Sequence, residues 1–350
     1  MSIAFIVGNG FNYIIGDIIN RPAGALETPE QLHERRATAM SIREITALWQ
    51  KFDAVFLELS NQFQERGIRI NHEEMIRMIY AVINLFSSIS GFEQVIPPSD
   101  IEKLRSVFDG FLLDKIREIA KEFKDHEDSD AYSRIRSYFP TVPATVTEFI
   151  QSRQLGKVRV FTTNYDGIFD TIFTNWPMGG FIFSDGFIKS NSYPDLLELE
   201  PAYVASNTLV AAHLHGSYRF TKRFGRTYKT RANYDNSEPV MVFNNPNMKE
   251  EIVRADNVLS AYYQHLALIL KKYDKLVILG NSMEAEPHIK KLINKYFNRE
   301  GTSITVCSRN PSTIKNEVLP FYNRGEIHEL STNGISTEQD LIDLFDHLLR

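Results

Sequence analysis

The sequence has little cysteine, no long apolar run and no excess of basic residues, and each shortage excludes a class of protein. Cys307 is the only cysteine among 350 residues, so an intramolecular disulfide and a cysteine-based structural zinc site are both excluded. No window approaches the roughly 18 apolar residues of a membrane-spanning helix, and the opening MSIAFIVGNG lacks the basic segment of a signal peptide. We therefore expect a cytoplasmic protein with no membrane partner.

The charge balance disfavours a general nucleic-acid binder. The chain has 39 basic and 44 acidic residues, a formal net charge of −5, and lacks the positive field typical of such proteins. One local stretch, SYRFTKRFGRTYKTR at 217–231, alternates basic and aromatic residues. That pattern is compatible with phosphate or nucleic-acid contact, although a solvated loop explains it equally well.

What is present is an alternation of strands and helices. Residues 3–7 form an apolar run that ends at a glycine, and further strands are predicted in KVRVFTTN, TLVAAHLHG, PVMVFNN, KLVILGNS and SITVCSRN. Helical periodicity follows at 257–272, at 287–298 and in the final TEQDLIDLFDHLLR. This order predicts an α/β fold, with a Rossmann-like, mostly parallel sheet and helices on both of its faces.

Residues 28–150 interrupt the alternation, because their periodicity is helical throughout. We therefore predict one α/β domain made of residues 1–27 and 151–350, with a large all-helical insertion at 28–150. Ser99 followed by Glu102 predicts a capping box at the start of one of these helices.

Ligands of open α/β sheets lie beyond the carboxyl ends of the strands, so the residues at the strand ends are the candidates for function. At the first end, two glycines would let a phosphate approach the backbone near a helix N-terminus. A complete dinucleotide fingerprint would need a third glycine where Tyr13 stands, so an ordinary strand-to-helix turn remains an alternative. The candidate binding residues here are Gly8, Asn9, Gly10, Phe11 and Asn12.

The second end, TTNYD, carries four polar side chains. Alternation along an extended chain points Asn164 and Asp166 to the same side, while Thr162 and Thr163 can bond to backbone groups. A helix cap at Asn164 or Asp166 is the alternative, but it accounts for only one of the four polar residues.

The third end carries His213, His215 and Gly216. Two histidines at i and i+2 on a strand share a face, which is also a spacing of metal ligands, but no neighbouring cysteine or acidic residue completes such a site. Proton transfer by a histidine before the glycine is the stronger hypothesis, and a hydrogen-bonded structural histidine stays open.

At the fourth end, Gly280 permits close backbone approach, and Asn281 and Ser282 offer polar groups to a phosphate or a ribose. Glu284 and Glu286 follow and could hold sugar hydroxyls, although exposed acidic residues in loops commonly bind nothing.

Taken in order, GNGFN, TTNYD, HLHGS and GNSMEAEP resemble the sirtuin-like NAD-binding superfamily. Sirtuins carry G-A-G-[IV]-S, T-Q-N-[IV]-D, a histidine before a glycine, and G-T-S-[LM] followed by a proline. The resemblance covers residues 2–12 and 157–310. It implies that Asn164 and Asp166 face the nicotinamide ribose and amide, that His215 is the catalytic base, and that the glycines and Ser282 line the dinucleotide.

The departures from the sirtuin pattern are informative. The four-cysteine zinc module is missing, Asn12 replaces the loop serine, and no P-D-F-R segment follows the glycine loop. The chain thus looks like the zinc-free sirtuin-like proteins of bacterial anti-phage systems. That likeness implies a regulated anti-phage effector that hydrolyses NAD to nicotinamide and ADP-ribose without a metal. It also implies assembly as a homo-oligomer or with a HerA-type ATPase or a short Argonaute.

Two other functions stay open. The site could bind NAD or an ADP-ribose derivative without cleaving it, as a scaffold or sensor. The chain could instead be a nucleic-acid effector subunit that works with a partner ATPase. An oxidoreductase is disfavoured, since the full fingerprint and its acidic ribose partner are missing.

Overall fold

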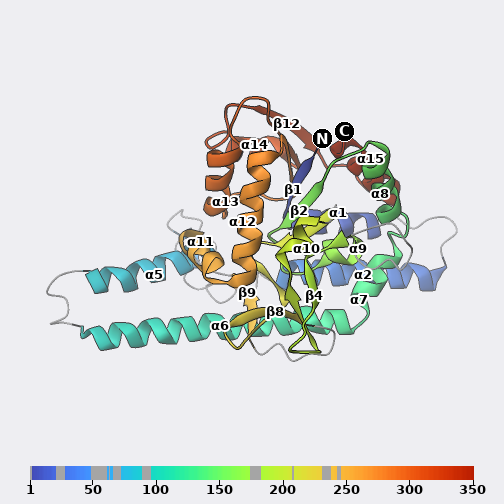
Figure 1. Ribbon diagram of the computed structural model, residues 1–350. Helices are drawn as coiled ribbons and strands as arrows, with labels where there is room; N and C mark the ends of the chain where they lie inside the picture. The colour runs from blue at the N-terminus through green and yellow to red at the C-terminus, as the bar shows by residue number, and fades with distance from the viewer. Residues whose placement is uncertain are drawn as a thin grey trace.

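The computed structural model describes residues 2–20, 28–48, 61–62, 64–65, 72–88, 96–173, 183–206, 209–230, 238–242 and 246–350. Its centre is a seven-stranded sheet in the order β12-β11-β10-β1-β2-β6-β3, in which all neighbouring strands are parallel. The predicted Rossmann-like α/β fold is therefore confirmed (Figure 1). The strands are β1 (Ile3–Val7), β2 (Val158–Thr162), β3 (Phe183–Ser184), β6 (Leu209–His213), β10 (Lys275–Leu279), β11 (Ser303–Ser308) and β12 (Glu326–Ser331).

Helices cover both faces of the sheet, because successive side chains of a buried strand point to opposite sides. In β1, Ile3, Phe5 and Val7 belong to one hydrophobic cluster, and Ala4 and Ile6 belong to the other. The first cluster includes α1 (Gly10–Ile19), α8 (Val142–Ser152), α9 (Ile168–Phe173) and α15 (Glu338–Leu348). The second includes α12 (Asn257–Lys272), α13 (Pro287–Leu292), the π-helix η3 (Ile293–Phe297) and α14 (Pro311–Val318).

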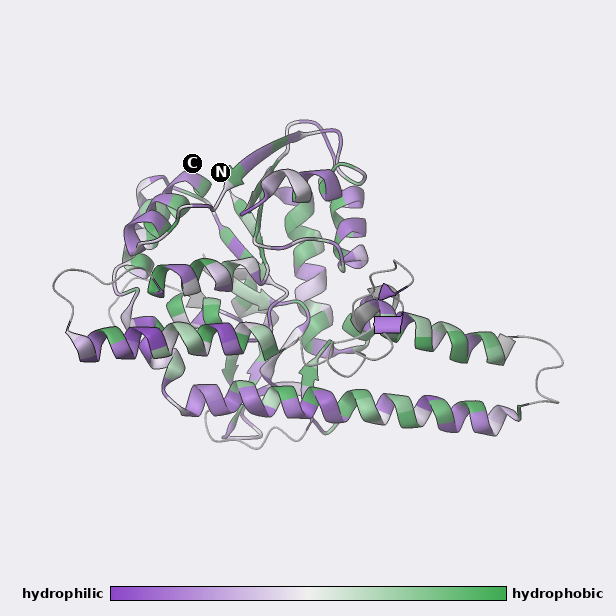
Figure 2. Cartoon of the chain, turned by 180° about the vertical axis from the view of Figure 1, so that it is seen from behind, coloured by the Kyte–Doolittle hydropathy of each residue, from purple (hydrophilic) through white to green (hydrophobic). Residues whose placement is uncertain are grey.

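The described residues between 28 and 152 are helical apart from short turns. They form α2 (Pro29–Ala47), α5 (His72–Ser88), α6 (Pro98–Asp128), α7 (Ala131–Ser137) and α8. Helices α5 and α6 pack together and extend away from the sheet as an arm in which hydrophobic and polar residues are mixed (Figure 2). Where α6 reaches the sheet, Ile119 and Phe123 join the same core as Ile14 and Val146, so the helical segment and the sheet share one core.

The capping box predicted at Ser99 is wrong. Helix α6 begins at Pro98, with Pro97 in the cap position and no side-chain capping bond, so Ser99 already lies in the first turn. A capping box does form at Thr28 and Gln31, at the start of α2. No helix in the described part of the chain has both the length and the hydrophobicity to cross a membrane.

A second sheet is antiparallel, in the order β4-β5-β8-β7-β9, and the sequence analysis did not predict it. The basic stretch forms the hairpin of β7 and β8, whose turn holds Phe224 and Gly225 at positive φ, as a type I′ turn requires. The segment PVMVFNN supplies β9, which pairs with β7 and not with the parallel sheet. The elements are β4 (Phe187–Lys189), β5 (Leu196–Leu199), α10 (Pro201–Ser206), β7 (Gly216–Arg223), β8 (Arg226–Thr230), β9 (Pro239–Met241) and α11 (Pro246–Ala255).

Candidate functional site

The four predicted strand ends lie at one edge of the sheet. Val7 pairs in register with Leu279 on one side and with Thr162 on the other, and Thr162 pairs with His213. The chain leaves β1 for β2 on one flank and later adds β10 on the opposite flank. That arrangement is a topological switch point, where ligands of open α/β sheets bind.

The glycines at this edge hold two loops against each other. The amide of Gly8 donates to the Leu279 carbonyl at 2.9 Å, and that of Gly10 donates to the Gly280 carbonyl at 2.8 Å. A Cβ on Gly10 would lie 2.5 Å from the Gly280 Cα, and Gly280 itself has φ +62°. Close packing of the loops therefore accounts for these glycines without a bound phosphate. The amides of Phe11 and Asn12 donate to backbone carbonyls of the same turn.

Asn12, Asn164 and Asp166 form a buried hydrogen-bonded cluster. The Asn12 Nδ2 donates to Asp166 Oδ2 at 2.7 Å, and the Asn164 Nδ2 lies 3.5 Å from Asn12 Oδ1. The other Asp166 oxygen accepts from the Ile168 amide at 2.8 Å, so the helix-capping alternative also holds for this residue. Burial raises the pKa of Asp166, and the hydrogen bonds from Ile168 and Asn12 offset this only in part.

The other polar residues of these strand ends differ in exposure. The Thr162 hydroxyl donates to the Val7 carbonyl, and the Asn281 Nδ2 donates to Thr163 Oγ1 at 2.9 Å, so these side chains link the strand ends. Thr163 and Asn9 are half-buried, and Ser282 is exposed. A ligand arriving from solvent would therefore meet these three side chains before the Asn12, Asn164 and Asp166 cluster.

The two histidines do not share a face, contrary to the sequence-based expectation. His213 ends β6 and is fully packed, with Nδ1 3.0 Å from the Asn164 carbonyl and Nε2 2.7 Å from Asp170 Oδ2. Burial disfavours both charges, but the ion pair outweighs it, raising the pKa of His213 and lowering that of Asp170. His213 is thus a structural residue that fixes the backbone of Asn164.

His215 lies in the turn between β6 and β7 and points to a different group of side chains. Its Nε2 is 3.1 Å from Glu286 Oε2 and 3.2 Å from His288 Nε2. On the far side of the carboxylate, the Lys249 Nζ is 3.6 Å from Glu286 Oε1. Gly216 follows at φ +83°, and a Cβ there would meet the Val240 carbonyl oxygen at 1.9 Å, so only glycine fits this turn.

The expectation that no acidic residue accompanies the histidines is therefore wrong for His215. Glu286 and His288 lie more than 70 residues further along the chain, at the start of α13, and folding brings them beneath the β6–β7 turn. Their Glu-Pro-His order at a helix start was the only sequence signal. Burial opposes ionisation of Glu286, yet His215 and Lys249 lower its pKa to about 2, while burial and His215 lower that of His288 to about 3.

Tyr165 lies between the two clusters. It follows Asn164 directly, and its ring centroid is 6.4 Å from that of His215. Its hydroxyl donates to the Val242 carbonyl at 2.8 Å, next to the end of β9. Tyr165 thus contacts His215 across the neighbouring ends of β2 and β6, while Asn164 and Asp166 belong to the separate cluster around Asn12.

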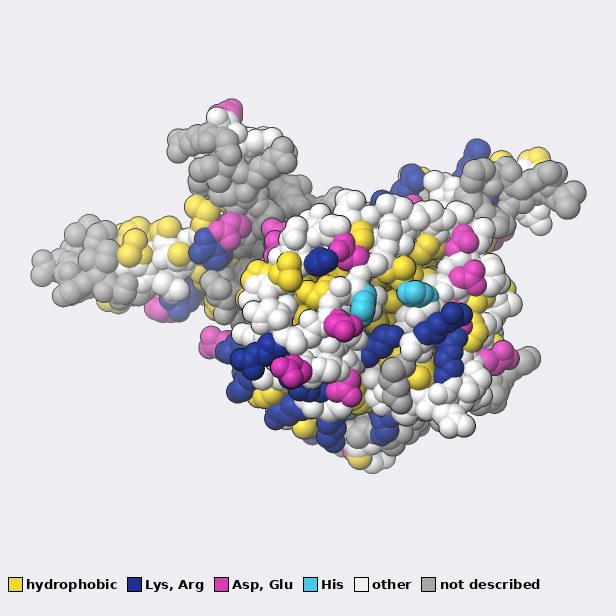
Figure 3. Space-filling view, turned by 90° about the horizontal axis from the view of Figure 1, so that it is seen from above, with side chains coloured by type: hydrophobic (Ala, Val, Ile, Leu, Met, Phe, Trp, Pro, Cys, Tyr) yellow, Lys and Arg dark blue, Asp and Glu magenta, His cyan; other side chains and the backbone are white. Residues whose placement is uncertain are grey.

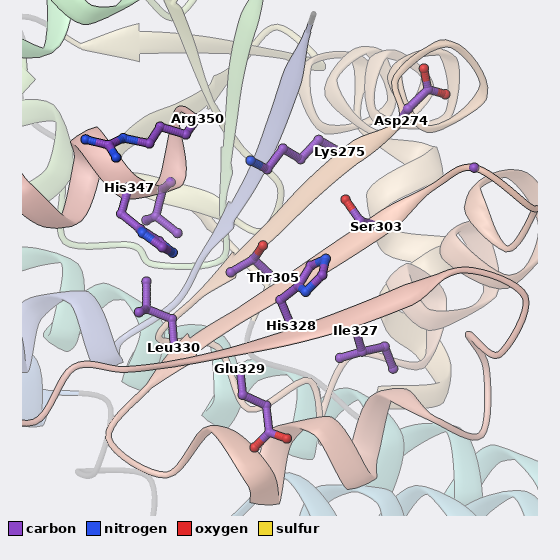
Figure 4. A pocket seen from close by; sticks show the side chains of 12 residues that line it. Asp274, Lys275, Ser303, Thr305, Ile327, His328, Glu329, Leu330, His347 and Arg350 are labelled. Atoms are coloured by element: carbon purple, nitrogen blue, oxygen red, sulfur yellow. The ribbon is translucent and has the colours of Figure 1, made fainter.

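A separate groove of about 770 Å³ lies over β10, β11, β12 and the end of α15, where the strands begin (Figure 4). Lys275 and Ser303, the first residues of β10 and β11, face His347 and Arg350 there. The side of the molecule in Figure 3 has basic and acidic side chains interspersed. The groove lies where β10 and β11 begin, at the opposite edge of the sheet from the predicted site, and its lining contains none of the predicted site residues.

No family model matches this chain, and no curated protein matches it.

Proposed function

We propose that this protein hydrolyses NAD at the bond between nicotinamide and ribose. The observation that supports the proposal is that the strand ends leading to Asn164, Asp166 and His215 are neighbours at the switch point of a parallel sheet, where Tyr165 contacts His215. The order of the motifs along the chain, which resembles that of sirtuin-like proteins, supports NAD as the substrate.

The leaving group determines which residues the chemistry needs. Nicotinamide departs from a cationic pyridinium and takes the bonding electrons with it, so no strong general acid is required, and an oxocarbenium-like ribose remains. Water then bonds to the ribose carbon and releases one proton. In this mechanism the Asn164 carboxamide orients the ribose or the water, and His215 accepts the proton. Asp166 binds the carboxamide of nicotinamide or stabilises the developing positive charge.

Glu286 gives His215 a partner for its role as a base. A carboxylate 3.1 Å from Nε2 stabilises the imidazolium that forms when the ring accepts a proton. Because Lys249 holds the opposite oxygen, the carboxylate has a fixed orientation. Glu286 thus acts as a positioning and electrostatic partner of the base.

The test is release of nicotinamide and ADP-ribose from NAD, measured by chromatography with the purified chain. We expect His215→Gln to lower the rate by about 10²–10⁴-fold, the usual contribution of a positioned proton-transfer group. Asn164→Ala, which loses the group that orients the ribose or the water, should lower it by about 10²-fold. His328→Ala is the matched control, since this histidine is exposed on β12. Far-UV circular dichroism verifies folding, and retained nicotinamide release in both site variants would refute the assignment.

The scaffold or sensor function is the second candidate, and the burial of Asn164 and Asp166 favours it. Both side chains are already hydrogen-bonded within the protein, at 6% and 5% exposure. Such a protein would bind NAD or an ADP-ribose derivative and return it unchanged, so the same product analysis separates the two functions.

A hydrolase of an abundant cofactor needs control, so we propose regulation by assembly, either as a homo-oligomer or with a defence-system partner of the HerA-type ATPase or short Argonaute class. The nucleic-acid effector function has less support, because Arg219 and Lys229 of the basic hairpin form ion pairs with Glu127 and Asp185. Comparing nicotinamide release by the chain alone and with its partner tests the proposed regulation.

A further inference from the structure

We propose that His215, Glu286 and His288 form a binding site for one divalent transition-metal ion, with Zn²⁺ as the best match. The three side chains come from the β6–β7 turn and from the start of α13, and their ligand atoms lie within 4.8 Å of one another. All three are buried, with exposures of 1%, 7% and 2%. Two imidazoles and one carboxylate are a ligand set that zinc accepts, leaving its fourth position for water or another ligand.

The two distances from His215 are close to those of a tetrahedral ion. Bonds of about 2.0–2.2 Å to nitrogen and oxygen place neighbouring ligand atoms of a tetrahedron roughly 3.3–3.5 Å apart. The His215 Nε2 lies 3.2 Å from His288 Nε2 and 3.1 Å from Glu286 Oε2. The printed contact of His288 with Glu286 is longer, 3.8 Å from Nδ1 to Oε2, so these two side chains must move closer together to surround an ion.

The hydrogen bonding of the cluster is incomplete, which is the second observation that points to a ligand. Within the described part of the chain, Glu286 Oε2 and His288 Nδ1 are buried and have no hydrogen bond of normal geometry. A neutral His215 has at most one proton at Nε2, and that proton faces two acceptors, Glu286 Oε2 and His288 Nε2. A cation would accept electron pairs from Glu286 Oε2 and from both Nε2 atoms at once, with the proton of His288 on Nδ1.

Lys249 acts against the cation and so provides a sharp control. Its ammonium group lies 3.6 Å from Glu286 Oε1 and donates to the Ala285 carbonyl at 3.1 Å. It orients the carboxylate so that Oε2 faces the histidines, but its charge repels the ion. Replacing it by methionine, which keeps the length of the side chain, should therefore strengthen metal binding.

The experiment uses the full chain without a histidine tag, freed of metal by a chelator. Co²⁺ is the spectroscopic probe, because three or four protein and water ligands give it visible absorption bands, and Zn²⁺ is titrated by calorimetry. We expect one ion per chain, at least 100-fold weaker binding in Glu286→Gln and His288→Ala, unchanged binding in His328→Ala, and tighter binding in Lys249→Met. No saturable binding, or equal affinity in the wild type and Glu286→Gln, would overturn the proposal.

One consequence rests on the proposed function: a metal ion bound by His215 and Glu286 would occupy both the proposed base and its carboxylate partner. Nicotinamide release should then be faster in chelator than with one equivalent of Zn²⁺. Equal rates, with Co²⁺ and Zn²⁺ still bound, would overturn this competition and leave the metal site standing. No nicotinamide release under any condition would instead count against NAD hydrolysis, since metal binding is measured without turnover.

Discussion

Substitution of Gly10 by alanine tests whether the glycines at the switch point exist to pack two loops together. The added Cβ would lie 2.5 Å from the Gly280 Cα and 2.8 Å from its carbonyl oxygen, whereas ordinary contacts begin at 3.4 Å. The neighbouring atoms belong to the backbone and cannot rotate away, so the loops must separate by about 1 Å. Overpacking of this kind costs roughly 1–3 kcal/mol of stability.

Gly110→Ala is the matched control, because a Cβ at this position on α6 meets nothing within 4 Å. Alanine is a better helix former, and we expect a gain of about 0.5–1 kcal/mol there. Urea unfolding followed by far-UV circular dichroism measures both changes. With a slope near 3 kcal/mol/M, a loss of about 2 kcal/mol lowers the midpoint by roughly 0.7 M. A midpoint for Gly10→Ala at or above that of the wild type would refute the reasoning.

Three further predictions concern buried groups. Tyr132→Phe removes the hydroxyl that donates to the Asp166 carbonyl and should cost about 1–3 kcal/mol in the same urea assay; no loss would show that the carbonyl finds another donor. Burial raises the pKa of Cys307 to about 12, so a thiol reagent at pH 8 should react only after unfolding, and fast labelling of the native protein would contradict its burial. Burial disfavours the Asp170 carboxylate, but the ion pair with His213 outweighs burial and lowers the pKa of Asp170. The stabilisation of the folded protein by this ion pair is therefore present above the ordinary pKa of 3.8 and is lost as the pH falls through the lowered pKa. Asp170→Asn should remove this part of the acid dependence of the unfolding midpoint, and an unchanged pH profile would contradict it.

The sequence sufficed for β1, β2, β6, β10 and β11, because these strands are short, apolar and separated by helical periodicity. It did not predict the two-residue β3 or the edge strand β12, whose segment EIHELS is largely polar and exposed. The second sheet could not be predicted from the sequence in the same way. The strands β7 and β8 carry charged and aromatic residues, which suit a half-buried hairpin as well as a basic loop. The decisive signal was the Phe224–Gly225 turn between two alternating segments, a feature that specifies a hairpin by its backbone geometry.

The candidate site shows a different limit. A strand end can be identified from its own residues, so the convergence of the segments at Gly8, Thr162, His213 and Gly280 followed from topology alone. The direction of each side chain did not, because the strand β6 ends at His213 and the next two residues turn. Because of that turn, His213 and His215 do not point to the same face of the strand. His215 instead contacts Glu286 and His288, whose own positions depend on the packing of α13. The two histidines therefore acquire different chemistry from neighbours that no local spacing could specify: His213 is held by a carboxylate at hydrogen-bond distance, while His215 lies in a cluster whose buried polar atoms are only partly satisfied.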